Sequence, residues 1–530
     1  SEEQYSSTPA SEPDTSDSEI SSKDAEAPAD EITQDFSDDQ ADTFQQEPAN
    51  ETESAADLEA DFEDGSASSA GDTETENGFK YTTSGLTATI TEYTGNDTTV
   101  KVPSKIGKYT VTKLGYNAFY NNISIEKVIL ADSITEIGNQ AFYGCAALKS
   151  LTLPAQLKTL GYGFISGTAI TSLTIPASLT SCVSYDSYYS GGSYGSLGGA
   201  ENLTELIFES GIESIPDKLA WLTPSETTRL TSITIPDTVT SIGNYAFSNC
   251  KKLTAISIPD SVTCISNEAF SGCQKLASIQ WSQNLQTIGR SSFSGCSSLE
   301  NIVFPKTVKT VGSSAFYNCT SVSSISFTDN SKGGFYVDIQ SSAFSNCTAL
   351  ENISFSKNIK HLEPSAFYGC SSLVDVVLSD NITDIDYMAF SNCTALKSIK
   401  LPSKLKTLGY GFISGTLVSS LTIPASLTSC VSYDSYYSSG SYGPLGGAEN
   451  LTELTFEYGI ENIPAKLAWL TSSETTHLTT VSIPDTVTSI GNYAFYNCKA
   501  LEETYIPDTV TSIANTAFQG WKKLVIKGFA

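Results

Sequence analysis

Apolar and polar positions along most of the chain follow a pattern that repeats about every 23 residues. The repeated unit reads Ala-Phe-x-x-Cys-x-x-Leu-x-x-Ile-x-Ile-Pro, and residues 246–259 carry all of it. The end of the unit alternates apolar and polar residues, which predicts a short strand with Ile256 and Ile258 facing inward and Ala255 and Ser257 facing outward. The proline that follows ends the strand, so each unit is expected to make one turn of the chain.

Units of this length cannot bury their apolar face alone, so they must stack on one another. The strand motif occurs 17 times from residue 125 onward, and stacked copies are expected to pair in parallel. The phenylalanine of the unit keeps the period at Phe247, Phe270, Phe293 and Phe316. We therefore predict a repeat solenoid of mostly strand and loop, with short helical or irregular turns, an elongated parallel β-sheet face and no single deep pocket.

Residues 78–116 precede the first complete unit and have a different pattern of residues. Thr, Ile, Val and Tyr alternate there in short runs, which Gly95, Asn96 and Asp97 separate, and this predicts strands joined by a turn. A solenoid would otherwise expose the open core of its first coil, so we expect these residues to form an N-terminal β cap. The solenoid itself is then expected over residues 117–530.

A second, longer period lies on top of the first. Cys182 and Cys430 are 248 residues apart, and the residues around them repeat at the same distance. We infer that a block of units was copied whole, with one copy at about 138–256 and the other at about 386–504. Each copy contains a stretch rich in Tyr, Ser and Gly that departs from the 23-residue period.

These two stretches are the candidate ligand-binding sites. Tyr offers a large amphipathic contact area at low entropic cost, and Ser and Gly let a loop adapt, as in many recognition loops. The alternative is that the tyrosines pack back onto the solenoid, since the copying of a whole block explains their recurrence without selection for binding. The candidate residues are Tyr185, Tyr188, Tyr189, Tyr194, Tyr433, Tyr436, Tyr437 and Tyr442.

Residues 1–77 consist mainly of Asp, Glu, Ser, Thr, Ala and Pro, and they are expected to be disordered because they cannot bury enough apolar surface to offset the entropy of ordering. They suit a solvated stalk or linker as well as an unstructured terminus. Residues 1–78 hold 25 of the 59 acidic residues and one of the 29 basic residues, so most of the net charge of −30 lies there. Neither part offers the basic stripe of a nucleic-acid binder, and no nucleic-acid partner is expected.

Nine of the twelve cysteines occupy one position of the repeated unit. Free cysteine is among the most buried residue types and suits a tight inner turn, so this ladder predicts buried free thiols. Bridges between neighbouring rungs are the alternative, although parallel Cβ vectors disfavour the required dihedral. Cys182 and Cys430 fall at core positions, whereas Cys264 aligns with Ser241 and is the best candidate for an exposed thiol. The ladder consists of Cys145, Cys250, Cys273, Cys296, Cys319, Cys347, Cys370, Cys393 and Cys498.

The sequence predicts no catalytic residue, no metal site and no cofactor. The cysteines lack the short spacings of zinc ligands. His361 and His477 lie more than one hundred positions apart, so neither a Ser-His-Asp nor a Cys-His arrangement is supported. Aspartates that follow proline, such as Asp237 and Asp260, could form a calcium-binding row, but ordinary turn chemistry explains them, with each carboxylate bonding nearby backbone amides.

The repeated unit, with Ile-Pro-Asp-x-Val-Thr-x-Ile-Gly between successive copies, resembles the BspA-type class of leucine-rich repeats, as residues 235–247 illustrate. The resemblance covers about residues 79–530. It implies a bacterial surface or secreted protein, and some members are linked to adhesion to host matrix proteins or to other bacteria. It carries over no fixed set of binding residues, and the Tyr-rich stretches depart from the period of the family.

From this resemblance we expect a non-catalytic, extracellular protein, secreted or on the cell surface, that binds a host or bacterial surface protein or glycan as a monomer. No run of 18 apolar residues occurs, so no transmembrane segment is expected. Residues 1–4 lack the features of a secretory signal but suit a trimmed secreted chain. The alternative is a structural spacer of the cell envelope that displays a neighbouring domain outside this chain.

Overall fold

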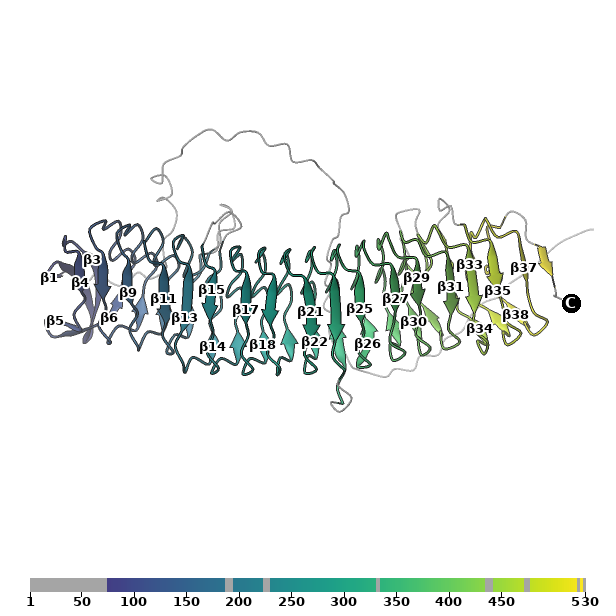
Figure 1. Cartoon of the computed structure of the whole chain (residues 1–530), viewed down its shortest axis with the longest axis horizontal. Coiled ribbons are helices and arrows are strands. Elements are labelled where there is room, and N and C mark those ends of the chain that lie inside the picture. The colour runs from purple at the N-terminus through teal and green to yellow at the C-terminus, as the bar shows by residue number, and fades with distance from the viewer. Residues whose placement is uncertain are drawn as a thin grey trace, which may run out of the picture. The chain divides into compact units, whose positions relative to one another are not determined.

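The computed structural model describes residues 74–185, 194–222, 229–329, 334–433, 442–470, 477–521 and 525–527. The chain divides into two units, Ser1–Ala67 and Ser68–Ala530, and all the described residues belong to the second unit. That second unit is a β-solenoid of about 17 turns, and its described residues contain no helix. The prediction of a repeat solenoid is therefore confirmed, with irregular rather than helical turns between its strands (Figure 1).

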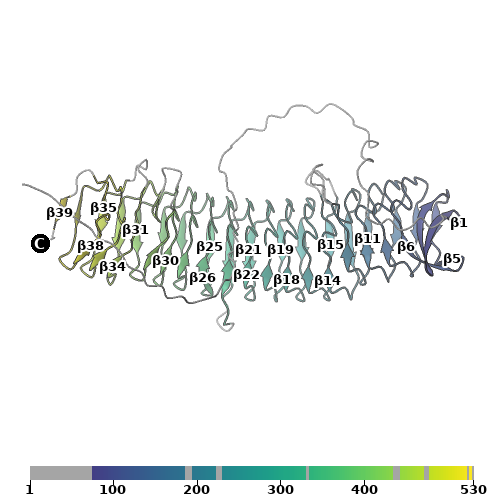
Figure 2. The ribbon, with the colours of Figure 1, turned by 180° about the vertical axis from the view of Figure 1, so that it is seen from behind.

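Each coil contributes one strand to each of two walls, which Figure 2 shows from behind. The long-strand wall consists of β4 (Thr99–Lys101), β7 (Lys127–Ile129), β9 (Ser150–Thr152), β11 (Ser172–Ile175), β13 (Glu205–Phe208), β15 (Ser232–Thr234), β17 (Ala255–Ser257), β19 (Ser278–Gln280), β21 (Asn301–Phe304), β23 (Ser324–Phe327), β25 (Asn352–Ser354), β27 (Asp375–Val377), β29 (Ser398–Lys400), β31 (Ser420–Ile423), β33 (Glu453–Phe456), β35 (Thr480–Ser482), β37 (Glu503–Tyr505) and β39 (Val525–Lys527). The short-strand wall consists of β6 (Tyr109–Leu114), β8 (Glu136–Ile137), β10 (Thr159–Leu160), β12 (Ser181–Cys182), β14 (Ser214–Ile215), β16 (Ser241–Ile242), β18 (Cys264–Ile265), β20 (Thr287–Ile288), β22 (Thr310–Val311), β24 (Val337–Ile339), β26 (Ile359–Leu362), β28 (Asp384–Ile385), β30 (Thr407–Leu408), β32 (Ser429–Cys430), β34 (Asn462–Ile463), β36 (Ser489–Ile490) and β38 (Ser512–Ile513).

Alternation along each strand decides which side chains enter the core. In β17, Ile256 is buried between the exposed Ala255 and Ser257, as the sequence predicts. Ile256 pairs with Ile279 of β19 in a parallel register. Neighbouring coils therefore place equivalent side chains next to one another, and the apolar stripe runs from coil to coil.

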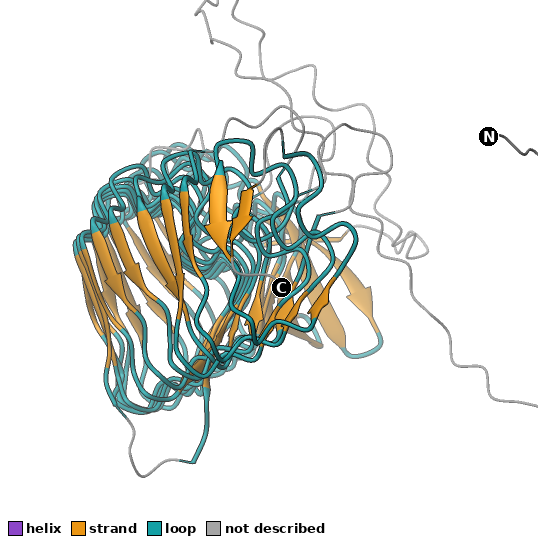
Figure 3. Ribbon diagram, turned by 90° about the vertical axis from the view of Figure 1, so that its right-hand side faces the viewer, coloured by secondary structure: helices purple, strands orange, loops and turns teal. Residues whose placement is uncertain are grey.

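The third side of each coil is a hydrogen-bonded series of turns around the Ala-Phe-x-x-Cys motif, which we call the turn wall. Around Phe247, the backbone N–H groups of Tyr245, Phe247 and Asn249 donate to carbonyls of the next coil at 2.7–3.0 Å. Two residues in this segment, Tyr245 and Asn249, have positive φ angles of 56° and 61°. Viewed along the axis, strands and loops of successive coils lie over one another, so that one repeat position follows one edge of the solenoid (Figure 3).

Phenylalanine rings and cysteine thiols fill the core behind the turn wall. Phe270 and Phe293 are fully buried, and their rings stack 5.2 Å apart at 6°. The Cys296 thiol donates to the Phe270 carbonyl oxygen of the preceding coil at 3.3 Å. All twelve cysteines are free and the nine of the ladder are buried, which confirms the prediction of buried thiols. Each thiol thus fills a tight position without leaving its S–H group unsatisfied.

At the beginning of the described residues, β1 (Glu74–Glu76), β2 (Phe79–Ser84) and β3 (Thr87–Tyr93) pair antiparallel. Strand β3 then pairs in parallel with β6, and β5 (Lys105–Ile106) pairs antiparallel with β6. The buried Tyr93 ring lies 5.5 Å from Phe119, so these strands cover the apolar end of the first coil. Strand β1 lies inside the segment 1–77 for which the sequence favours disorder, and residues 1–73 of that segment lie outside the described residues.

Candidate functional site

The short-strand wall is interrupted at two places, after β12 and after β32. These two strands directly precede the two Tyr-rich stretches of the copied block. In the first copy, Tyr185 and Tyr194 form an isolated antiparallel bridge, and each backbone N–H donates to the carbonyl of the other at 2.9–3.0 Å. Residues 186–193 between them lie outside the described residues, and Tyr188 and Tyr189 with them.

The bridge places the Tyr185 and Tyr194 rings beside Tyr162 of the preceding coil, and we call these three residues cluster 1. Ring centroids lie 5.5 Å apart for Tyr162 and Tyr185, 5.7 Å for Tyr162 and Tyr194, and 5.5 Å for Tyr185 and Tyr194. The interplanar angles run from 36° to 82°, so the rings meet at a tilt or edge to face. All three residues are partly exposed.

Glycines make room for the Tyr194 ring. A Cβ atom at Gly198 would lie 2.3 Å from the Cδ2 atom of Tyr194, and one at Gly163 would lie 3.2 Å from its Cε2 atom. Only residues without a side chain let the ring approach the backbone this closely. Tyr194 is therefore packed against the solenoid and remains partly exposed, so packing describes part of its role and ligand binding stays a prediction.

A row of side chains continues from cluster 1 along the edge of the turn wall. Lys218 Nζ donates to Ser184 Oγ at 3.1 Å and lies 4.8 Å from the centre of the Trp221 ring, as in a cation–π contact. The Trp221 ring lies 5.0 Å from that of Tyr245. Tyr245 Oη donates to Glu268 Oε1 at 2.9 Å. The edge therefore presents aromatic, basic and acidic groups in order along four successive coils.

The second copy of the block repeats this arrangement, with cluster 2 formed by Tyr410, Tyr433 and Tyr442. Tyr433 and Tyr442 form the same antiparallel bridge, and residues 434–441, with Tyr436 and Tyr437, lie outside the described residues. Tyr410 lies 5.5 Å from each of the other two rings, and Tyr433 is 42% exposed.

The row that continues from cluster 2 also matches the first copy. Lys466 Nζ lies 2.9 Å from Ser432 Oγ and 5.0 Å from the Trp469 ring centre. Trp469 in turn lies 4.9 Å from the Tyr493 ring.

Burial and neighbouring groups keep the hydroxyl of Tyr410 in cluster 2 protonated. Burial raises the pKa of Tyr410 well above its ordinary value, and the neighbouring Tyr387, whose ring stacks on it at 4.7 Å, adds to the shift. A neutral phenol can both donate and accept a hydrogen bond. The cluster therefore offers apolar ring surface together with polar hydroxyl groups, a combination that suits the recognition of a ligand.

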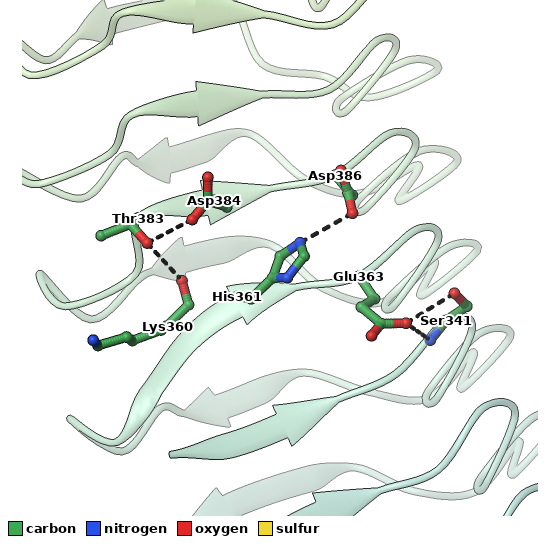
Figure 4. A network of polar contacts seen from close by, with 7 residues as sticks. All are labelled: Ser341, Lys360, His361, Glu363, Thr383, Asp384 and Asp386. Carbon is green, nitrogen blue, oxygen red and sulfur yellow. Dashed lines mark hydrogen bonds and ion pairs between the residues drawn. The ribbon is translucent and has the colours of Figure 1, made fainter. Parts of the chain in front are cut away.

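Sequence reasoning missed a histidine–aspartate pair on the short-strand wall. His361 Nε2 of β26 lies 3.0 Å from Asp386 Oδ2, just beyond β28 in the next coil (Figure 4). The hydrogen bond to Asp386 raises the pKa of His361, although partial burial opposes the shift. The signal was present in the sequence, because Asp386 stands at the position that glycine occupies in units such as those of Gly243, Gly289 and Gly312.

The groups around His361 do not form a hydrolytic site. The hydroxyl of Ser341 donates to Glu363 at 3.1 Å, and that of Thr383 donates to Asp384 at 2.6 Å. Each hydroxyl in Figure 4 is thus committed to a carboxylate or a carbonyl rather than to the imidazole. The pair acts as an ion pair between two coils when the imidazole is protonated.

Cysteines and aspartates elsewhere have structural partners. Cys182, Cys264 and Cys430 are partly exposed, and the two wall breaks explain why the core positions 182 and 430 are incompletely covered. Asp260 accepts from the Gln283 N–H of the next coil at 2.8 Å, so its carboxylate caps a neighbouring backbone amide. Over the described ranges, no group of three or more His, Cys, Asp or Glu residues is placed to hold a metal ion.

Two open hollows of about 540 and 530 Å³ lie on the solenoid surface, one beside Phe355 and the other beside Phe335. Within the part of the chain that the structure describes, no helix is long and apolar enough to cross a membrane.

Comparisons with known proteins point to one family. The profile of the BspA type leucine rich repeat region matches residues 96–193, 225–333, 336–441 and 471–526. A solved leucine-rich repeat protein from Bacteroides ovatus is 23% identical, with 67% of this chain and 95% of that chain covered and a TM-score of 0.46. A leucine rich cell surface protein from Faecalibacterium prausnitzii is 26% identical over 64% of this chain and 91% of that one, with a TM-score of 0.38. The pneumococcal vaccine antigen PcpA is 15% identical over 86% of this chain and 99% of that one, with a TM-score of 0.35. No curated protein matches the chain.

Proposed function

Since the chain belongs to the BspA type leucine-rich repeat family, we propose that it is a non-catalytic binding protein, secreted or held on a bacterial cell surface, that recognises a protein or glycan partner. The proposal draws most on one observation. Two tyrosine clusters of matching geometry project from the same repeat position, next to the two breaks in the short-strand wall.

The composition of the clusters suits adhesion to another molecule. Partly exposed tyrosine rings combine apolar surface with a hydroxyl, and they lose little entropy on binding because only two torsions must be fixed. Lys218 and Lys466 add a positive charge beside each cluster, held over a tryptophan ring. Burial of such rings at the centre of an interface typically supplies much of its binding energy.

The ligand-binding residues we propose are the eight tyrosines that the sequence singles out. Four of them, together with Tyr162 and Tyr410, form the described clusters. In this proposal Tyr185 and Tyr433 contact the partner, while Tyr194 and Tyr442 hold the cluster against glycine backbone. The rest of the edge contributes weaker polar contacts.

The competing possibility is a structural spacer of the cell envelope. It draws support from the walls, where outward Ser and Thr side chains bond to neighbouring coils, as Thr204 Oγ1 does to the Thr171 carbonyl at 2.9 Å. Side chains engaged in this way strengthen the stack and leave a chemically uniform surface.

A binding array distinguishes the two functions. The full chain is incubated with host matrix proteins and glycans, beside a double variant Tyr185→Ala/Tyr433→Ala and a control Tyr458→Ala, whose side chain is 78% exposed and lies outside both clusters. We expect micromolar binding of a subset of ligands that the double variant loses by about 10-fold or more, as for loss of aromatic anchors. Binding that survives in the double variant as in the control would refute the role of the clusters and favour the spacer.

A further inference from the structure

The two clusters are related by a simple shift along the solenoid. The ten strands β14 to β32 form one continuous parallel sheet, and β12 belongs to the coil before β14. Cluster 1 follows β12 and cluster 2 follows β32, so ten coils separate them. With ~4.8 Å between neighbouring strands, the clusters lie roughly 50 Å apart on the same edge.

This relation by translation limits the symmetry of a partner that engages both clusters at once. All the strands between the clusters are parallel, so both clusters present their groups with the same polarity along the axis. A two-fold symmetric partner presents its two sites with opposite polarity. A linear polymer of one polarity presents the same unit again and again in one direction, and it fits both clusters together.

Resting on the proposed function, we propose that clusters 1 and 2 bind a single chain of an uncharged polysaccharide that lies along the edge of the turn wall. Each cluster holds one short stretch of sugar units against its tyrosine rings. The edge between them guides the polymer without needing a third anchor.

The residues between the clusters suit the binding of a sugar polymer. At the position of the turn wall that Tyr245 occupies in its coil, four successive coils carry partly exposed serines, each with a positive φ: Ser291, Ser314, Ser342 and Ser365. Their short hydroxyl side chains can exchange hydrogen bonds with sugar hydroxyls, and the partly exposed rings of Tyr317 and Tyr368 on the same wall add apolar surface beside them.

The charge of the protein argues for a neutral polymer. Residues 79–530 hold 34 acidic and 28 basic residues, a net charge of −6, so the solenoid offers a polyanionic glycan no net attraction. At 0.15 M salt, charges more than about 8 Å away are largely screened. Lys218 and Lys466 lie beside the clusters, where they hydrogen-bond to Ser184 and Ser432 and lie over tryptophan rings. Each lysine therefore adds one charge to its own cluster, and the two do not form a continuous basic surface for a polyanion.

Occupation of both clusters by one chain would raise the apparent affinity without new contacts. Once one cluster holds the polymer, the second binds units that are already tethered nearby, at an effective concentration on the order of millimolar. A gain of about 10²-fold or more over a single cluster is then expected. A tetrasaccharide is too short to reach both clusters and gains nothing from the second.

The test compares polymers with their own short fragments. Mannan, dextran, β-1,3-glucan and xylan are each paired with the matching tetrasaccharide, and binding to the full chain is measured by surface plasmon resonance and calorimetry. The variants are Tyr185→Ala, Tyr433→Ala and the double change, with Tyr458→Ala as a matched exposed tyrosine. Circular dichroism checks that each variant retains the fold.

We expect two tetrasaccharide sites per chain, one in each single variant and none in the double variant. For the polymer, either single change lowers the apparent affinity by about 10²-fold, to the level of the tetrasaccharide. Equal affinities of the full chain for polymer and tetrasaccharide would overturn the bridging of the clusters, and so would single variants that only halve the capacity. Binding of a protein ligand that needs the clusters, with none of the four polysaccharides bound, would overturn the polysaccharide and leave the proposed function standing. Ligand binding that the double variant retains in full would refute both the polysaccharide proposal and the proposed function of the clusters.

Discussion

Replacement of Phe293 by alanine tests the physical basis of the stack. The Phe293 side chain is fully buried, its ring lies 5.2 Å from Phe270 and 5.3 Å from Phe316, and Trp281 meets it edge to face at 5.3 Å. Removal of a buried phenylalanine costs about 3–5 kcal/mol through lost transfer energy and the cavity that remains. The coils on both sides hold the backbone in place, so we expect little collapse of the cavity and a loss near the upper end of this range.

Phe518 provides a matched control near the end of the same row. Its ring stacks on one phenylalanine, Phe495 at 5.4 Å, and it is partly exposed. Phe518→Ala should therefore cost only about 1–2 kcal/mol, since less apolar area leaves water when the ring packs. Urea denaturation followed by far-UV circular dichroism measures both. Equal losses of unfolding free energy at the two positions would refute the view that each ring is stabilised by neighbours on both sides.

Three further predictions concern the thiols, the pair of His361 and Asp386, and the glycine that packs against Tyr194. A thiol reagent should label Cys264 rapidly in the native protein and the nine ladder thiols only on unfolding, because burial raises the pKa of thiols such as Cys273 to about 12. Cys182 and Cys430 are partly exposed, but burial raises the pKa of their thiols as well, so they should react much more slowly than Cys264. Rapid labelling of all twelve thiols would contradict this. His361→Asn should lower the urea midpoint of unfolding at pH 5.5 and leave it unchanged at pH 8.5. Because the pKa of His361 is raised in the folded protein, its ion pair stabilises the fold below the ordinary histidine pKa of about 6.5, and this stabilisation disappears as pH rises through the folded pKa. A difference between variant and native protein that grows with pH would contradict this. Gly198→Ala should weaken ligand binding several-fold at cluster 1 with little change in circular dichroism, because the new Cβ atom would lie 2.3 Å from the Tyr194 ring. Calorimetry that still finds two equal sites would exclude a role of Gly198 in positioning that ring.

The repeat period predicted the walls and the core because each side chain there is either buried or exposed according to its position in the repeat. Ile256 is buried and Ser257 is exposed, as expected from alternation alone, and Cys264 pairs with Ser241 as the alignment of repeats indicates. The period could not show that Tyr162 meets Tyr185 and Tyr194. That contact depends on a stretch outside the repeat period whose ends, Tyr185 and Tyr194, form a bridge, and the period carries no information on how these two residues pack.

The pair of His361 and Asp386 also depends on the stacking of coils, which adjacency in the sequence does not reveal. The two residues are 25 apart, which is one coil and two positions. A search for groups close in sequence or in a known catalytic order passes over them, whereas an alignment of coils places Asp384 directly opposite His361 and Asp386 just beyond it. In a solenoid, spacing by the period brings residues together as adjacency does elsewhere.

The turn wall shows how such a fold can acquire a binding edge without losing stability. The position before Ala-Phe has a positive φ in successive coils, held by backbone bonds such as that from the Tyr245 N–H to the Asn267 carbonyl at 3.0 Å. A left-handed conformation disfavours most side chains, yet the bonds to the next coil enforce it whatever the residue. Glu268, Ser291 and Met388 occupy it with φ between 51° and 56°. Since the backbone fixes this position and the core does not use its side chain, its chemistry can change from coil to coil, and the aromatic rows lie where the fold is least restrictive.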